Sequence, residues 1–142
     1  MANVLTVNLA HSRANPADAR LTTGIDKRPT GDRVAVRSPG PMHGGLGSGL
    51  HGDHVGNQRV HGGDDQAVYA YAREDLDAWQ LRLGRDIGNG VFGENLTTTG
   101  IDVDEAEVGS GWGIARVGHE LRSLRARCNY FDVWMGRGGH DY

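Results

Sequence analysis

The chain has a single cysteine, Cys128, in the segment "LRARCNY", with Arg122, Arg125 and Arg127 close to it. Positive neighbours lower the pKa of a thiol and raise its thiolate fraction, and a thiolate is both a nucleophile and a soft metal ligand. A buried, inert cysteine is also common, so the local sequence leaves both interpretations open. One thiol excludes an internal disulfide and a zinc site built from several cysteines of one chain.

A second candidate site is a group of histidines in a segment rich in glycine and aspartate. His51, His54 and His61 follow one another closely, with Asp53 beside them. His-x-x-His spacing can bring two imidazoles to one metal ion. The chain has no H-E-x-x-H helix, and a loop fixes no spacing, so we expect most of these histidines to be solvated or to form turns.

The stretch "GSGLHG" at residues 47–52 fits the G-x-G-x-x-G pattern of dinucleotide-binding proteins. That motif follows a strand and opens a helix, whereas Pro39 and Pro41 precede this stretch and further glycine and histidine follow it. The chain also lacks G-x-x-x-x-G-K-[ST], and no serine lies in a G-x-S-x-G elbow. The sequence therefore argues against a dinucleotide site, a P-loop and a hydrolase-type nucleophile.

The elements that must position these residues are short. The chain has 23 glycines in 142 residues, about 16% against roughly 7% in average proteins. Such a pattern is typical of brief strands joined by tight turns that need positive φ angles. The segments 3–10 and 33–38 are predicted strands, because valine and leucine recur near period two. Residues 39–63 are predicted to form a long ordered loop with at most one short strand.

The strongest predicted element is a helix from about Asp65 to Leu83. Apolar residues recur there at three- and four-residue steps: Ala67, Val68, Tyr71, Ala72, Leu76, Trp79 and Leu83. Asp64 or Asp65 can cap its start, and Gly84 supplies the left-handed residue at its end.

The second half of the chain is predicted to be mostly β-structure. The segments "IDVDEAEV", "GWGIARV" and "HELRSL" are short and β-like, and "NYFDVWM" can form one helical turn that buries Phe131, Trp134 and Met135. The fold class is therefore α+β and β-rich, with one main helix on a twisted sheet or barrel. The length suggests a single domain over residues 1–142.

Composition narrows the class of partner and the compartment. The formal net charge is -3 and the pI is near 6.1, so no strongly basic balance indicates nucleic acid. The N-terminal segment has no charged stretch followed by an apolar run, as a signal peptide would. No apolar stretch reaches the roughly 20 residues that span a bilayer. We therefore expect a soluble, cytoplasmic protein that binds neither nucleic acid nor membrane.

Four segments taken together resemble a known family. They are "TGIDKRP", "GLGSGLHGDHVGNQRVHGGDDQAVYAYAREDLDAW", "GVFGENLTTTGIDVDEAEVGSGW" and "RARCNYFDVWMG", in this order. The chain resembles a MOSC domain, named for the C-terminal part of molybdenum-cofactor sulfurase, from about Thr23 to its end. The His-Gly-Gly and Phe-Gly-Glu-Asn blocks are specific only in combination.

The resemblance implies a fold centred on a β-barrel, and a molybdenum cofactor (molybdopterin) held in a groove. Cys128 matches the family cysteine, which is regarded as the molybdenum ligand or as a persulfide carrier, so we predict it as the catalytic and metal-binding residue. By motif position, the predicted cofactor-binding residues are Lys27, His61, Gly62, Gly63, Gln66, Glu94, Asn95 and Arg125.

The chain departs from the family pattern at three places. Leu124 and Arg127 replace the prolines of Pro-Arg-x-Pro-Cys, while Arg125 is kept, and Asp64 replaces the proline of His-Gly-Gly-Pro. Related proteins also continue well past the point that matches Tyr142. We therefore expect an incomplete barrel, and a homodimer that covers the unpaired strand edge.

Three functions remain open from the sequence. The first is reduction of small N-hydroxylated compounds by a molybdenum-cofactor-dependent oxidoreductase, with a separate electron-donor protein. The second is a sulfur carrier, in which a Cys128 persulfide sulfurates the cofactor; its sulfur would come from a partner cysteine desulfurase, the only place where pyridoxal phosphate enters. The third is a shortened, non-catalytic binding module.

Overall fold

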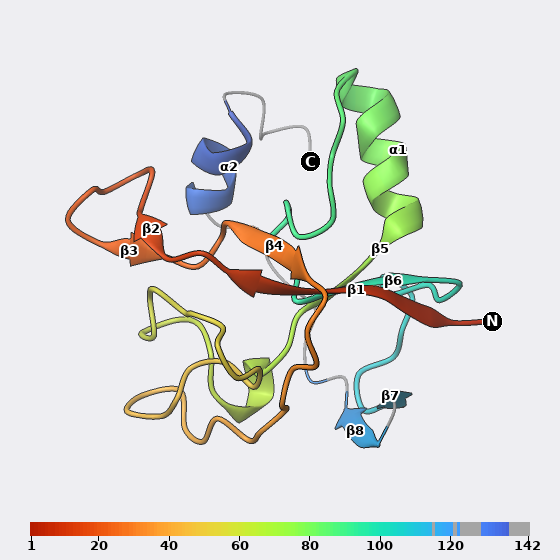
Figure 1. Cartoon of the computed structure of the whole chain (residues 1–142), viewed down its shortest axis with the longest axis horizontal. Helices are drawn as coiled ribbons and strands as arrows, with labels where there is room; N and C mark the ends of the chain where they lie inside the picture. Colours follow the sequence, from red (N-terminus) through yellow and green to blue (C-terminus); the bar gives the residue numbers. More distant parts are fainter. Residues whose placement is uncertain (115, 121, 123–128, 137–142) are drawn as a thin grey trace.

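The computed structural model of the chain describes residues 1–114, 116–120, 122 and 129–136. Its centre is a four-stranded sheet in the order β4-β1-β6-β5. The strands are β1 (Asn3–Ala10), β4 (Lys27–Thr30), β5 (Ala70–Ala72) and β6 (Leu96–Thr99). The first strand, β1, confirms the predicted strand at residues 3–10 and runs through the middle of the molecule (Figure 1).

The register of this sheet brings together segments that are far apart in the sequence. β1 pairs antiparallel with both β4 and β6, so that Ala10 faces Lys27 and Val7 faces Leu96. β5 pairs parallel with β6, with Ala70 opposite Leu96. The residues at the ends of β4 and β6 therefore meet beside the C-terminal half of β1.

Two further ribbons complete the β-structure of the described residues. β2 (Arg13–Ala14) pairs with β3 (Thr22–Thr23), and β7 (Gly111–Ile114) pairs with β8 (Val117–Glu120). The three sheets do not join into a closed barrel within the described part of the chain. This confirms an α+β, β-rich fold with an incomplete barrel; the expected homodimer stays a prediction.

The main helix is shorter than the predicted range of about 65–83. A 3₁₀ turn, η1 (Asp64–Gln66), and strand β5 come first, and α1 spans Arg73–Leu83. The cause is competition for backbone groups: the carbonyl of Tyr69 accepts hydrogen bonds from the amides of Asn95 and Leu96, which draws residues 70–72 into the sheet. Apolar steps of three to four residues cannot exclude a strand that leads into a helix.

The N-terminal end of α1 differs from the prediction, whereas its C-terminal end agrees with it. Asp64 and Asp65 do not cap it, and its N-cap residue is Ala72, without a side-chain cap. Instead the carboxylate of Glu74 accepts hydrogen bonds from the Thr99 hydroxyl and the Gly100 amide, which ties the first turn to the end of β6. Gly84 ends the helix in the left-handed region at φ 62°, as predicted.

Two predicted strands are wrong. Residues 33–38 form a single bridge, Val36 to Leu50, because the chain leaves the sheet there to begin the long loop. Residues 101–108 form turns and bends instead of a strand. Of the remaining β-like segments, "GWGIARV" supplies β7 and the first residue of β8, and His119 and Glu120 of "HELRSL" lie in β8. Residues 121, 123 and 124 of that segment lie outside the described residues. "NYFDVWM" forms α2 (Asn129–Met135).

The hydrophobic core lies between α1, α2 and the turn that leads into β6. Leu76, Ile87, Phe92 and Met135 are buried there. The Phe92 ring meets Phe131 edge to face at 5.1 Å between centroids. The indole N–H of Trp134 donates to the carbonyl of Val91 at 2.9 Å, which fixes α2 on this turn.

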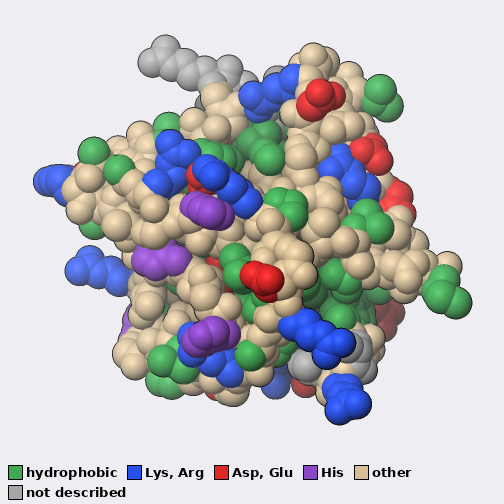
Figure 2. Space-filling view, in the orientation of Figure 1, with side chains coloured by type: hydrophobic (Ala, Val, Ile, Leu, Met, Phe, Trp, Pro, Cys, Tyr) green, Lys and Arg blue, Asp and Glu red, His purple; other side chains and the backbone are tan. Residues whose placement is uncertain are grey.

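Charged side chains of both signs are interspersed on the face that Figure 2 shows. Asp26, for example, lies between Arg13 and Arg28, at 3.2 and 2.9 Å. Among the described residues, no helix is long and apolar enough to cross a membrane.

Replacing Leu76 by alanine tests the core directly. Leu76 is fully buried, and deleting a buried leucine to alanine costs about 2–5 kcal/mol. Leu81→Ala on the same helix is the matched control, because Leu81 is 86% exposed. Urea unfolding should show the loss for Leu76→Ala and a change within about 0.5 kcal/mol for Leu81→Ala. Equal effects of the two substitutions would show that α1 is rotated from this orientation.

Candidate functional site

The predicted site residues meet at a small polar cavity beside the end of β1. Five of them line a cavity of about 90 Å³: Lys27, His61, Gly62, Gln66 and Asn95. They come from β4, the long loop, η1 and the segment before β6. Residues separated by up to 68 positions in the sequence therefore line one cavity.

A carboxylate that the sequence analysis assigned only to a metal hypothesis organises this cavity. Asp53 accepts two hydrogen bonds from the ammonium group of Lys27, at 2.8 and 3.0 Å. The two side chains are only 8% and 1% exposed, for Lys27 and Asp53 respectively. Asp53 is therefore the buried counter-ion of Lys27.

Three further donors surround the Asp53 carboxylate. The Ser48 hydroxyl donates at 2.7 Å, the Asn95 amide group at 2.9 Å and the backbone N–H of Ala10 at 2.8 Å. Burial alone would raise the pKa of Asp53, but the Lys27 charge and these hydrogen bonds outweigh it and lower the pKa below its usual value. Asp53 thus stays ionised and joins β1, β4 and the long loop at one point.

Asn95 links the cavity to the sheet. Its side-chain oxygen accepts from the backbone N–H of Tyr69 at 3.2 Å, while its amide nitrogen donates to Asp53. The neighbouring backbone also pairs, because the Asn8 amide donates to the carbonyl of Asn95 at 2.7 Å. The side chain of Asn95 is held on both sides, and its position is therefore fixed.

Glu94 has a different environment from the other predicted site residues. It is fully buried, and its carboxylate accepts from the amides of Gly90 and Phe92 and from the Thr97 hydroxyl. Burial raises the pKa of Glu94, and these donors offset only part of that rise. Glu94 does not line the cavity; it shapes the turn that carries Gly93 and Asn95.

Two glycines allow the backbone segments around the cavity to touch. A Cβ atom at Gly24 would lie 1.9 Å from the carbonyl oxygen of His54, and one at Gly62 would lie 2.8 Å from that of Gly47. Gly62 also has φ of 88°, which a side chain disfavours. Gly63, next to it, is buried but does not line the cavity.

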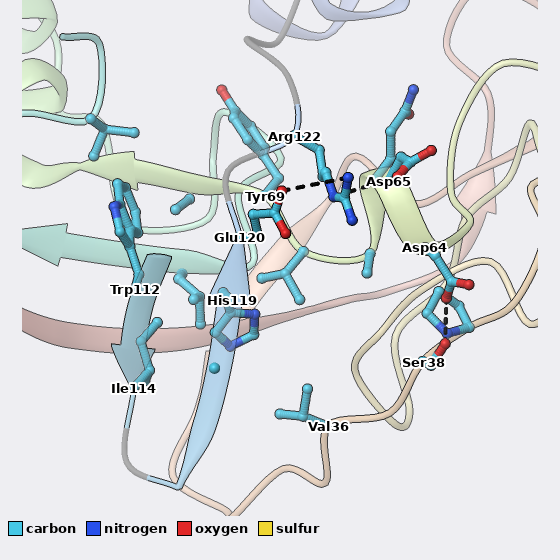
Figure 3. A pocket seen from close by; sticks show the side chains of 18 of the residues that line it. Val36, Ser38, Asp64, Asp65, Tyr69, Trp112, Ile114, His119, Glu120 and Arg122 are labelled. Atoms are coloured by element: carbon cyan, nitrogen blue, oxygen red, sulfur yellow. Dashed lines mark hydrogen bonds and ion pairs between the residues drawn. The ribbon is translucent and has the colours of Figure 1, made fainter. Parts of the chain in front are cut away.

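A much larger cleft shares a wall with this cavity. It has a volume of about 1070 Å³ and lies between the β7–β8 ribbon and residues 60–71. His61, Gln66, Ala67 and Tyr69 line both spaces. Figure 3 shows Trp112 and Ile114 of β7 and His119 of β8 on one side, with Tyr69 and the Asp64–Asp65 segment around them. Cavity and cleft therefore form adjoining parts of one site.

Burial alters the titration of two residues at this cleft. It raises the pKa of Tyr71 to about 12, a rise that the hydrogen bond from Trp79 partly opposes and nearby carboxylates add to. It lowers the pKa of His119. At neutral pH the cleft therefore presents a protonated phenol and a neutral imidazole.

Several sequence-based assignments have a clear outcome here. Cys128 and Arg125 lie outside the described residues, so their predicted roles stay predictions. Within the described ranges, no group of three histidines, cysteines or carboxylates is arranged to hold a metal ion. His54 instead lies 3.2 Å from the Thr22 hydroxyl, through Nε2, and Asp53 faces Lys27.

The sequence analysis missed Ser48 as a partner of Asp53 and missed Arg37 as part of the cleft. One signal in the sequence could have pointed to Asp53. It is an acidic residue in the turn "HGDH", within a loop that must pack against the sheet. Nothing in the sequence pairs it with Lys27, because the contact depends on the antiparallel register of β1 and β4.

A mixed sheet whose loops enclose a polar cavity beside a large cleft is an arrangement in which small-molecule sites are commonly found. A family model described as MOSC domain matches residues 57–141, more than half of the chain. The chain belongs to the MOSC domain family, which is associated with binding of the molybdenum cofactor.

Individual relatives agree with this assignment. YflK of Bacillus subtilis (strain 168) is 32% identical over 108 residues, or 75% of this chain and 45% of YflK. YiiM of Escherichia coli (strain K12) is 35% identical over 94 residues, or 60% of this chain and 41% of YiiM. The chain thus spans less than half the length of these relatives.

A solved structure supports the fold. The crystal structure of YiiM from Geobacillus stearothermophilus matches with a TM-score of 0.66 and 21% identity, over 95% of this chain and 57% of that chain. The match extends the similarity to the N-terminal strands, which lie before the region that the family model covers.

Removing the charge of Asp53 should destabilise the protein. Asp53→Asn leaves the Lys27 ammonium buried without its counter-ion, and breaking such a pair costs about 3–5 kcal/mol. Asp32→Asn is the matched control, because Asp32 is exposed, and it should change the free energy of unfolding by less than about 0.5 kcal/mol. Urea unfolding at pH 7 measures both.

The same variant predicts a pH dependence. The pKa of Asp53 is lower in the folded protein than in the unfolded chain, where it is about 3.9. Its contribution is therefore complete above that unfolded value and is lost as the pH falls through the folded pKa. The stability gap between wild type and Asp53→Asn should narrow below about pH 4. A gap that stays constant down to acid unfolding would contradict the pairing.

Proposed function

We propose that this protein binds the molybdenum cofactor through Cys128 and supports the reduction of small N-hydroxylated compounds. One observation carries the proposal: the residues that the family motifs place at the cofactor, Lys27, His61, Gly62, Gln66 and Asn95, converge on one polar cavity. They come from segments that nothing but the tertiary fold brings together.

The space available supports binding of a cofactor of this size. Pockets for small molecules and cofactors usually measure about 300–1,000 Å³. The polar cavity of about 90 Å³ is too small alone, whereas the adjoining cleft of about 1070 Å³ is sufficient. A buried guanidinium atom without a partner, Nε of Arg37, also lies in the cleft wall. The residues present thus fit a bound organic group.

The helix α2 is tied to the same turn as two residues that line the cavity. Asn129, the residue after Cys128, begins α2. α2 is held to the turn before β6 by the hydrogen bond from Trp134 to the carbonyl of Val91. Gly93 and Asn95, on the same turn, line the cavity.

The chain's own residues would bind and orient the reactants. The bound cofactor would supply two-electron chemistry at molybdenum, and reduction of an N-hydroxyl group consumes two electrons and two protons and releases the amine and water. The electrons come from a separate donor protein. His61 and Gln66, which line both spaces, would contact cofactor and substrate together.

Metal and pterin analysis tests this function. The protein purified from a host that makes the cofactor should contain stoichiometric molybdenum and pterin. Cys128→Ser should lose the molybdenum, because a serine hydroxyl is a harder and far less acidic ligand than a thiol. Leu81→Ala, exposed on α1, is the control and should retain the metal.

Two other outcomes would overturn the proposal in distinct ways. Sulfane sulfur that a reductant releases from Cys128, without molybdenum, would indicate a sulfur carrier supplied by a cysteine desulfurase. Neither molybdenum nor sulfane sulfur in a folded protein would indicate a binding module without cofactor chemistry.

A further inference from the structure

The site described so far leaves one cation unexplained. Arg37 lines the large cleft, and its Nε atom is buried with no hydrogen-bond partner among the described residues. No ion pair in the described part of the chain involves its guanidinium group either. A buried donor without a partner costs about 1–3 kcal/mol, so a buried Nε–H without an acceptor, on an arginine of the cleft wall, needs an explanation, and a ligand that supplies the acceptor is one.

Lys27, in the polar cavity, is already neutralised by an acidic partner. The ammonium of Lys27 donates to both oxygens of Asp53, and this pair is almost completely buried. An anionic ligand group at Lys27 would have to compete with a carboxylate that four donors hold in place. The polar cavity is therefore a poor place for an anion, although the family motifs assign Lys27 to the cofactor.

The acidic residues of the cleft are partly occupied by the protein itself. The Asp64 carboxylate accepts from the Ser38 hydroxyl and the Gly40 amide. Asp65 and Glu120 share Arg122, at 3.7 and 3.5 Å, and Figure 3 shows this cluster apart from the contact between Ser38 and Asp64. Among the described residues that line the cleft, Arg37 is therefore an arginine without an ion pair.

The rest of the cleft suits a flat, largely apolar body. Aromatic side chains of Tyr69, Tyr71 and Trp112 line it, with Val36, Val68 and Ile114. Trp112 and Ile114 approach from β7 on the side opposite Val36 (Figure 3). Aromatic faces bind ring systems by stacking, which adds about 0.5–1.5 kcal/mol beyond the buried area.

We propose that the large cleft binds a flat, ring-containing organic anion, and that Arg37 is the residue that contacts its anionic group. The inference rests on the proposed function, because it names the ligand chemistry of the same site. Two sources share this chemistry: the phosphate-bearing pterin of the cofactor, and a ring-containing substrate with a carboxylate. In both, the ring lies against the aromatic wall, and the other end of the molecule reaches His61 and Gln66.

Two simple probes separate the sources. Phenyl phosphate carries a ring and a phosphate, and benzoate carries a ring and a carboxylate. Titration of ¹⁵N-labelled protein with each probe is followed through the arginine Nε–H signals and the Trp112 fluorescence. The Arg37 signal should shift with at least one probe. Tighter binding of phenyl phosphate would assign the cleft to the cofactor phosphate, and tighter binding of benzoate would assign it to the substrate.

The variant Arg37→Gln should weaken binding of the preferred probe by about 10-fold or more, the effect of losing one charged hydrogen bond. Arg33→Gln is the matched control, because Arg33 is exposed and does not line the cleft; it should bind as the wild type does. Trp112→Leu gives a second, independent test. It should weaken the binding of both probes without changing the preference between phosphate and carboxylate.

Each outcome decides the inference. Absence of binding by both probes, equal affinity of Arg37→Gln and wild type, or displacement of the Lys27 signals instead of the Arg37 signal would overturn it. If Arg37→Gln does not fold, Arg37→Lys replaces it. If Arg37→Lys binds the probes with the affinity of the wild type and with the same preference between phosphate and carboxylate, the result counts against the proposal. Molybdenum content is measured in parallel: a protein without molybdenum that still binds the probes through Arg37 would refute the proposed function and leave this inference intact.

Discussion

The buried ion pair between Lys27 and Asp53 is the contact on which the rest of the site depends. Its two partners lie in β4 and in the long loop, and the same carboxylate holds Asn95 and the end of β1. A buried charge must be matched by a counter-charge and by hydrogen bonds, since otherwise its desolvation is too costly. The requirement fixes where a loop with few apolar side chains meets the sheet. The loop closes through this pair and through glycines that allow backbone to touch backbone.

This arrangement assigns two tasks to different parts of the site, a rigid wall and a charged group for recognition. The family motifs by themselves assign both tasks to the same residues. The polar cavity is held rigid by its internal hydrogen bonds, and the charge of Lys27 is neutralised within it. The cleft is larger, aromatic, and has an unpaired guanidinium at Arg37. Rigid walls keep a binding surface preorganised, whereas an unpaired donor provides affinity for a ligand that supplies an acceptor. Motif residues such as His61 and Gln66 thus build the wall that cavity and cleft share, and in the proposed site a residue outside the motifs, Arg37, would provide the charge for recognition.

Membership of the MOSC domain family links this geometry to the molybdenum cofactor, and the core explains how the two halves of the chain cooperate. The turn before β6 has two sides. On one side Phe92 and Val91 contact α2, and on the other side Asn95 lines the cavity. Glu94 stabilises this turn through backbone amides. Packing of the segment that follows Cys128 is therefore coupled to the position of the cavity wall, so a change in either should be felt at the other.

The sequence by itself determined the fold class, the first strand, the helix end at Gly84 and the family, because these follow from local periodicity, from glycine's backbone freedom and from ordered motifs. It also selected Lys27 and Asn95, which the fold brings to one cavity. Only the tertiary structure decided that residues 70–72 are a strand, since parallel pairing with β6 outweighs a helical pattern. It likewise decided that Asp53 pairs with Lys27, and that Nε of Arg37 is buried without a hydrogen-bond partner in the part of the chain that the structure describes. Charge pairing is a property of distance in space, and the register of β1 with β4 and β6, which sets those distances, is not encoded in any one segment.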